Sequence, residues 1–210
     1  MRIRITFSKT GALRYIGHLD LHKLLERTSR RAGLDLMYSQ GFHPQPKIQL
    51  ASALPLGFSS TCELVDMWIN GEVDLETLPE RLSKAVPPGL GIRKVEYVEE
   101  KSPPLQTQVV STEYDVVLPD GLDTEVLKNS VSTCLQAETL HRERRGKAYD
   151  LRPLIEALEL GERDAAGKFH LALRLAAREG ATGRPEEVLD ALGIPYEETR
   201  VERRKMIFRE

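Results

Sequence analysis

Residues 2–8 read Arg2-Ile3-Arg4-Ile5-Thr6-Phe7-Ser8, so polar and apolar side chains alternate along this stretch. A period of two places Ile3, Ile5 and Phe7 on one face, which is typical of a half-buried strand. We therefore predict a strand over residues 2–8 whose apolar face packs against a core.

A helix is predicted next, over residues 18–32. Leu21, Leu24 and Leu25 recur there at the spacing of one helical face, and Gly33 is the residue type that most often follows a helix end. Apolar patterns between Gly and Pro breaks predict strands over residues 34–39, 48–54, 63–69 and 92–98 and a helix over residues 75–86.

The second half of the chain restarts this order of elements. The same criteria predict strands over residues 111–118, 169–175 and 201–208 and helices over residues 123–135 and 185–192, whereas residues 149–160 fit neither pattern clearly. The order strand, helix, strands, helix, strand in each half indicates an α+β protein of two tandem ferredoxin-like domains with antiparallel sheets. No repeat in the sequence itself supports the duplication.

The boundary between the domains is predicted in residues 101–108. This stretch contains the pair Pro103-Pro104 and few apolar residues, which is typical of a linker. We expect a first ferredoxin-like domain over residues 1–100, which carries a motif region from Lys9 to Gly57, and a second over residues 109–210.

The composition favours a folded cytoplasmic protein. Hydrophobic residues make up 40% and charged residues 30% of the 210 residues, with a mean hydropathy of −0.35, a balance that supports a packed core. No apolar run reaches the roughly 18 residues of a membrane-spanning helix. Cys62 and Cys134 are isolated, so the chain cannot build a cysteine-rich zinc or iron–sulfur site, and we expect no cofactor.

The charge is distributed unevenly along the chain. Residues 1–60 hold nine Lys and Arg against three Asp and Glu, whereas the whole chain has a net charge of −2. A basic first quarter indicates an anionic partner that meets one face; the alternative is a charged helix that only stays solvated.

The motif region contains the candidate binding residues. Gln40, Phe42 and His43 surround the flexible Gly41. The rings of Phe42 and His43 could stack on unpaired bases while nearby cations hold phosphates. The alternative is that Phe42 belongs to the core and the loop only shapes a connection. The predicted ligand- and RNA-binding residues are Lys9, Arg14, His18, Arg30, Arg31, Gln40, Gly41, Phe42, His43 and Lys47.

Signals for catalysis and for metal binding are weak. His18 and His22 have the spacing of two ligands on one helical face, but no third ligand is evident nearby, and we predict no metal site. The chain has no Walker-type phosphate loop, no Gly-x-Ser-x-Gly elbow and no cysteine triplet. We identify no catalytic residue.

Several strings of the chain, in order, resemble the radical-SAM-linked protein family. They are Phe7-Ser8-Lys9-Thr10-Gly11-Ala12-Leu13-Arg14-Tyr15-Ile16-Gly17-His18-Leu19-Asp20, Arg30-Arg31-Ala32-Gly33-Leu34, Tyr38-Ser39-Gln40-Gly41-Phe42-His43-Pro44, Leu54-Pro55-Leu56-Gly57, Asp150-Leu151-Arg152-Pro153-Leu154-Ile155 and Arg184-Pro185-Glu186-Glu187-Val188-Leu189. Gly17 stands where the family has serine, and His43 where asparagine is common. The resemblance implies an accessory role to a radical SAM enzyme, often a cobalamin-binding one, with a link to RNA.

Three functions remain open from the sequence. The leading hypothesis is a non-catalytic accessory protein that binds RNA, or another anionic substrate, for the radical SAM enzyme. An alternative is a metal-independent endoribonuclease, by analogy of fold with CRISPR repeat-processing enzymes. A further alternative is a protein-interaction adaptor that docks the partner enzyme and does not bind nucleic acid.

Overall fold

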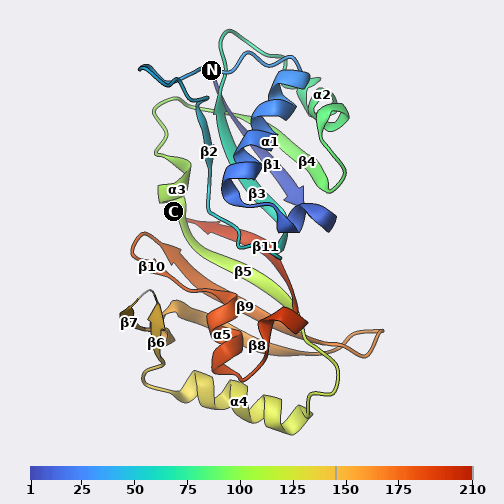
Figure 1. Cartoon of the computed structure of the whole chain (residues 1–210), viewed down its shortest axis with the longest axis vertical. Coiled ribbons are helices and arrows are strands. Elements are labelled where there is room, and N and C mark those ends of the chain that lie inside the picture. The colour runs from blue at the N-terminus through green and yellow to red at the C-terminus, as the bar shows by residue number, and fades with distance from the viewer. Residues whose placement is uncertain (145, 210) are drawn as a thin grey trace. The chain divides into compact units, whose positions relative to one another are not determined.

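The computed structural model describes residues 1–144 and 146–209 and shows an α+β fold, as predicted (Figure 1). The chain divides into two compact units, Met1–Val109 and Val110–Glu210. Each unit combines strands with helices.

The first unit contains a four-stranded antiparallel sheet in the order β4-β1-β3-β2. Its register is fixed at the centre, where Ile5 of β1 lies opposite Val65 of β3 and Val95 of β4. The elements are β1 (Arg2–Lys9), the 3-10 turn η1 (Gly11–Tyr15), α1 (His18–Arg31), β2 (Ile48–Leu50), β3 (Ser59–Trp68), α2 (Leu78–Ala85), β4 (Leu90–Val98) and the short α3 (Leu105–Gln108).

The core of the first unit lies between one face of this sheet and both long helices. The predicted strand face is buried together with Leu21 and Leu25 of α1 and Leu78 and Leu82 of α2 in a single apolar cluster. Each such side chain contributes about 1.5–3 kcal/mol when it is fully removed from water. The two helices therefore cover the same face of the sheet.

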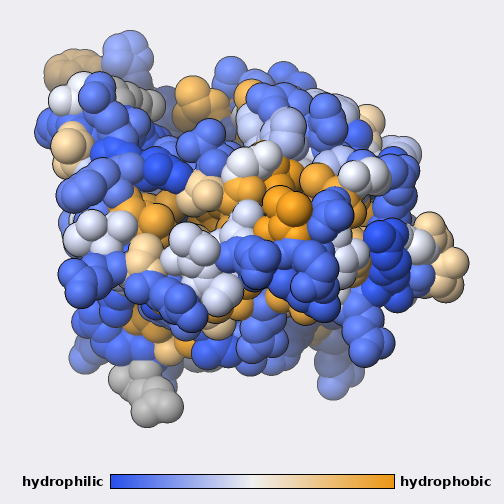
Figure 2. Space-filling model, turned by 90° about the horizontal axis from the view of Figure 1, so that it is seen from below, coloured by the Kyte–Doolittle hydropathy of each residue, from blue (hydrophilic) through white to orange (hydrophobic). Residues whose placement is uncertain are grey.

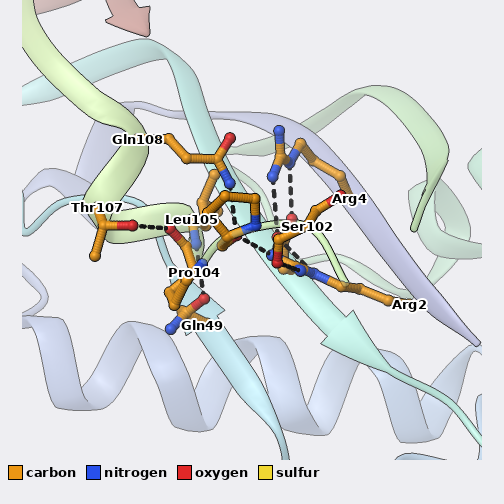
Figure 3. A network of polar contacts seen from close by, with 10 residues as sticks. Arg2, Arg4, Gln49, Ser102, Pro104, Leu105, Thr107 and Gln108 are labelled. Atoms are coloured by element: carbon orange, nitrogen blue, oxygen red, sulfur yellow. Dashed lines mark hydrogen bonds and ion pairs between the residues drawn. The ribbon is translucent and has the colours of Figure 1, made fainter. Parts of the chain in front are cut away.

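The opposite face of this sheet carries a buried charge network (Figure 3). Asp66 on β3 is 0% exposed and accepts hydrogen bonds from Arg2 and Arg4 of β1. Arg2 also donates to the carbonyl oxygens of Ser102, at 2.7 Å, and of Pro103, at 3.0 Å. These bonds fasten the end of the first unit to its sheet.

The segment 101–108, which we expected as a linker, belongs to the first unit. It contains α3, whose Leu105 is 0% exposed. The amide of Leu105 donates to the side-chain oxygen of Gln49 on β2 at 2.9 Å (Figure 3). The segment is thus tied both to β1, through Arg2, and to β2.

The second unit contains a sheet in which β11, β5 and β9 are neighbours in that order, and both β8 and β10 pair with β9. The elements are β5 (Val109–Val117), α4 (Thr124–Gln136), the hairpin β6 (His141–Arg144) and β7 (Lys147–Asp150), the 3-10 turn η2 (Arg152–Leu154), β8 (Ile155–Arg163), β9 (Phe169–Arg178), β10 (Ala181–Thr182), α5 (Pro185–Ala191), the 3-10 turn η3 (Tyr196–Glu198) and β11 (Arg200–Phe208).

Local chemistry explains the boundaries of these elements. Asp123 caps α4, because its carboxylate accepts from the amides of Glu125 and Val126, and this agrees with the helix start predicted at residue 123. Pro185 begins α5 at a position where the missing amide costs nothing. The alternating residues of β9, Leu171, Leu173 and Leu175, are all buried, as the period of two predicts.

One predicted strand is wrong. Residues 34–39 make only the isolated bridges Leu36↔Ile69 and Tyr38↔Pro46 instead of a continuous strand. The partner segment contains Pro44 and Pro46, which lack the amide that a ladder needs. The result is a loop closed at its base.

Candidate nucleic-acid interface

The loop of residues 39–45 is held at its two ends. Tyr38 and Pro46 form a bridge, and the amide of Ser39 donates to the carbonyl oxygen of Gln45 at 2.8 Å. The amide of Gln45 in turn donates to the hydroxyl oxygen of Ser39 at 3.0 Å. Gly41 has φ of +133°, a conformation that a residue with a Cβ rarely adopts. The loop thus has a fixed base and a tip shaped by glycine.

Phe42 extends from this tip into solvent. Its relative exposure is 102%, so the alternative that Phe42 belongs to the core is wrong. Gln40 and His43 beside it are exposed as well. An aromatic ring with both faces in water can stack on a nucleobase without first breaking a packed contact.

A cation lies at the base of the same loop. Arg30, near the end of α1, donates from Nη2 to the Tyr38 hydroxyl at 2.6 Å and to Glu26 Oε1 at 2.8 Å. The hydrogen bond to Tyr38 and, after it, the charges nearby raise the pKa of Arg30 above its usual range. Lys47 is exposed just after the loop. The arrangement combines a stacking ring, amide donors and positive charge.

The predicted site residues divide between the two ends of α1. His18 is the first residue of this helix and Arg30 its last but one, so at 1.5 Å per residue they lie about 18 Å apart. Arg14 and His18 therefore belong to a different surface from the loop. Arg31 lines a groove beside α2.

Lys9 is placed differently from our expectation of a surface ligand. It is 1% exposed, and its Nζ donates to the carbonyl oxygen of Ile16 at 3.2 Å. The sequence pattern predicts a strand that ends at residue 8, but β1 continues through Lys9. Lys9 therefore follows Ile3, Ile5 and Phe7 on the buried face. It is not part of the exposed interface.

Three exposed apolar side chains surround the start of α1 and were not among the predicted residues. Tyr15 is 63%, Leu19 75% and Leu56 59% exposed, and we call them the α1-start patch. The amide of Gly57 donates to the carbonyl oxygen of Arg14 at 2.9 Å, which brings the turn of Leu56 against η1. In the sequence, Leu19 lies off the apolar face of the predicted helix, which indicates an exposed apolar side chain at this position.

Apolar surface also occurs in the second unit. Figure 2 shows the side of the molecule on which α4 lies, with an apolar area, in orange, among hydrophilic residues. Val126 and Leu135 are the exposed large apolar residues of α4, at 63% and 37%.

Metal ligands do not gather among the described residues. No three His, Cys, Asp or Glu side chains come together there as a metal site, and His18 and His22 thus gain no third ligand. No helix within residues 1–144 and 146–209 is long and apolar enough to cross a membrane.

Comparison with known proteins assigns the chain to a family. Residues 2–185 match the family described as "Uncharacterized protein conserved in bacteria (DUF2344)", and the chain belongs to it. No curated protein matches the chain.

The chain is similar to several solved structures, including the following two. One is a chain in the crystal structure of a Cbf5-Nop10-Gar1 complex, with a TM-score of 0.51 and 10% identity over 97% of this chain and 48% of that one. This chain thus spans about half of that solved chain, and the likeness concerns the fold alone. The other is a putative glycine cleavage system transcriptional repressor, with a TM-score of 0.25 and 14% identity over 100% of this chain and 97% of that one. That likeness is too distant to inform on function.

Proposed function

We propose that this protein is a non-catalytic RNA-binding protein that contacts unpaired bases through the loop of residues 39–45. The observation that carries the proposal is the phenyl ring of Phe42, which is fully exposed at the tip of a loop whose base is fixed. Sequence-tolerant binding of single strands combines such stacking rings with nearby cations. Arg30 and Lys47 supply the cations.

We also propose that both units are ferredoxin-like domains, as the sequence pattern predicted. The sheet order β4-β1-β3-β2, with a helix after β1 and another after β3, supports this for the first unit. In the second unit β11, β5, β9 and β8 follow one another in the corresponding order, with α4 after β5 and α5 after β9. The hairpin of β6 and β7 and the short β10 are additions to that order.

A second candidate function is docking to a partner protein through the α1-start patch. Three exposed apolar side chains on neighbouring segments favour this role, since apolar surface grouped in this way marks interaction sites. The resemblance of the sequence to the radical-SAM-linked family makes a radical SAM enzyme the proposed partner. Accessory binding of RNA for that enzyme would use both surfaces.

Fluorescence anisotropy with a labelled single-stranded RNA of about 12 nucleotides tests the RNA-binding proposal. We expect saturable binding that weakens with salt, because cations on the protein replace counterions on the phosphates. Phe42→Ala removes a stacking ring, which is worth about 1–3 kcal/mol per base, or roughly fivefold to 150-fold in affinity.

The matched control is Leu56→Ala, which removes an exposed apolar side chain from the α1-start patch instead. We expect this variant to bind RNA like the wild type and to lose affinity for the partner enzyme. Absence of RNA binding at about 50 mM salt, or equal binding by wild type and Phe42→Ala, contradicts the proposal.

A further inference from the structure

A groove beside the end of α1 is lined by three cations. Its volume is about 510 Å³, and its charged lining residues are Arg31 of α1 and Arg81 and Lys84 of α2. The remaining lining residues are Ala85, Val86 and Pro87, so no carboxylate of the described residues lines the groove. Three like charges around one open space repel one another, and an anion that enters the space reduces this repulsion.

Arg81 is held in place by the backbone at the end of α1. Its Nη2 donates to the carbonyl oxygens of Ala32, at 2.7 Å, and of Gly33, at 3.3 Å. A Cβ at position 33 would lie 3.2 Å from this nitrogen, and Gly33 has φ of +71°. Glycine therefore permits the close approach that fixes the guanidinium at the groove.

The other two cations are available to a ligand. Arg31 is exposed and makes no ion pair within the described part of the chain. Lys84 pairs with Glu80 at 2.6 Å, but both side chains are more than 70% exposed. An exposed pair of this kind is worth little, so Lys84 can exchange Glu80 for a better anion.

Two carboxylates lie near the groove without lining it. Glu80 is the ion-pair partner of Lys84. The pKa of Asp74 is lowered mainly by hydrogen bonds from Glu76 and Thr77, and the positive charge of Arg81 adds a smaller effect in the same direction. These two carboxylates reduce the positive potential near Lys84 and Arg81, but neither of them forms an ion pair with Arg31.

We infer that this groove binds phosphate groups, with the phosphates of the RNA backbone as the natural ligand. Arginine guanidinium groups bind phosphate oxygens through paired hydrogen bonds, and lysine adds a mobile point charge. Arg30 and Arg31 are consecutive on α1, so a lining residue of the groove is the chain neighbour of the residue that contacts the base of the 39–45 loop. The identity of the ligand as RNA rests on the proposed function, whereas phosphate binding itself does not.

Nuclear magnetic resonance with inorganic pyrophosphate tests the groove independently of RNA. We expect saturable shifts of the Arg31 and Arg81 Nε–Hε signals and of the amides of residues 84–86 when pyrophosphate is added to the intact protein. The double variant Arg31→Ala/Lys84→Ala should keep its fold and lose the shifts that can still be followed in it, those of the Arg81 Nε–Hε signal and of the amides of residues 84–86. Lys23→Ala, which removes an exposed cation two turns earlier on α1, is the control and should keep them.

RNA titrations with the same variants then identify the ligand. Removing one cation that neutralises a phosphate of a single strand makes the slope of log affinity against log salt shallower by about 0.7. We expect the slope to become shallower by up to about 1.4 in the double variant and by less in the control. A wild-type protein without saturable pyrophosphate shifts, or a double variant that keeps them, overturns the inference whatever RNA does.

Failure of the proposed function gives a different result. Pyrophosphate shifts in the groove without RNA binding would overturn the RNA proposal and leave the phosphate site standing. RNA binding that depends on Phe42 but has the same salt slope in the double variant and in Lys23→Ala would overturn the groove as an RNA-binding surface.

Discussion

The carboxylate of Asp66 and the guanidinium of Arg2 form an ion pair at 2.6 Å with side-chain exposures of only 0% and 2%. The guanidinium carbon of Arg2 also lies 4.9 Å from the centroid of the Trp68 ring. Arg4 provides a second ion pair with the same carboxylate, at 2.8 Å. The charge of Asp66 thus compensates two cations that lie on the face of the sheet opposite the core.

Replacing Asp66 by asparagine should strongly destabilise the first unit. Asp66→Asn removes the negative charge of this network and leaves two guanidinium groups without their charge partner. Loss of one partner from a buried ion pair costs about 3–5 kcal/mol. Urea denaturation followed by circular dichroism measures the loss of free energy of unfolding. The control is Glu80→Gln, which breaks an exposed ion pair with Lys84 and should lower the free energy of unfolding by at most about 1 kcal/mol. Equal effects of the two variants would show that the Asp66 network contributes no more than a surface pair.

Gly89 is required by a close approach of two backbone segments. It has φ of +92°, and a Cβ there would lie 2.6 Å from the carbonyl oxygen of Thr10. The two segments are also joined by a hydrogen bond of 2.7 Å from the amide of Thr10 to the carbonyl oxygen of Gly89. Gly71 has a similar φ, +70°, but a Cβ there meets nothing within 4 Å. We expect Gly71→Ala to cost about 1–2 kcal/mol of the free energy of unfolding, from backbone strain alone.

Gly89→Ala should cost about 1–3 kcal/mol more than Gly71→Ala, because the added methyl group also displaces the Thr10 segment. The comparison of the two variants by thermal and urea denaturation isolates the steric contribution. A smaller cost for Gly89→Ala than for Gly71→Ala would mean that the turn relaxes without loss.

Stability of the second unit should depend on pH through His170. Its Nδ1 lies 2.9 Å from Asp115 Oδ1 and its Nε2 lies 3.2 Å from Asp164 Oδ2. The hydrogen bond to Asp115 and, next, the one to Asp164 raise the pKa of His170 above its usual 6.5. The folded state therefore prefers the protonated ring.

The stabilising effect of His170 should be complete below about pH 6.5 and should disappear as the pH rises through the raised pKa of the folded state. Thermal unfolding of the wild type and of His170→Gln between about pH 5.5 and pH 9 measures it. The difference in melting temperature should be largest at the acid end of this range. A difference that grows with rising pH would contradict the assignment.

Much of the fold was predictable because local periodicity and burial agree. The period of two in residues 2–8 and the helical spacing of Leu21 and Leu25 both identify side chains that the core buries. Residues 149–160 were not assigned because their apolar pattern changes phase. Pro153 lies in η2, and β8 begins only after it. Within β8, a shift of register between Ile155 and Ala157 moves the apolar positions from odd to even residue numbers. A bulge of this kind breaks the period of two within the segment, so neither the strand pattern nor the helix pattern fits its whole length.

The candidate site was predictable in composition but not in arrangement. The loop around Gly41 follows from turn chemistry, whereas the exposure of Phe42 depends on how residues 38 and 46 pair. The sequence also groups His18 with Arg30 as members of one motif region, although α1 separates them by about 18 Å. Spatial separation along a helix can be calculated from the sequence once the helix is predicted, and that step would have divided the candidate residues correctly.

Glu26 should restrain RNA binding by the 39–45 loop, because it competes with phosphate for Arg30. Its Oε1 lies 2.8 Å from Arg30 Nη2 and accepts a hydrogen bond from the Tyr38 hydroxyl at 3.2 Å. Glu26→Gln removes this charge and keeps a hydrogen-bonding oxygen, so RNA affinity at low salt should rise by about 0.2–1 kcal/mol, or up to roughly fivefold. Anisotropy titrations measure the change, with Glu125→Gln in the second unit as a control of equal charge change. If both variants gain affinity equally, net charge explains the effect and Arg30 does not contact RNA.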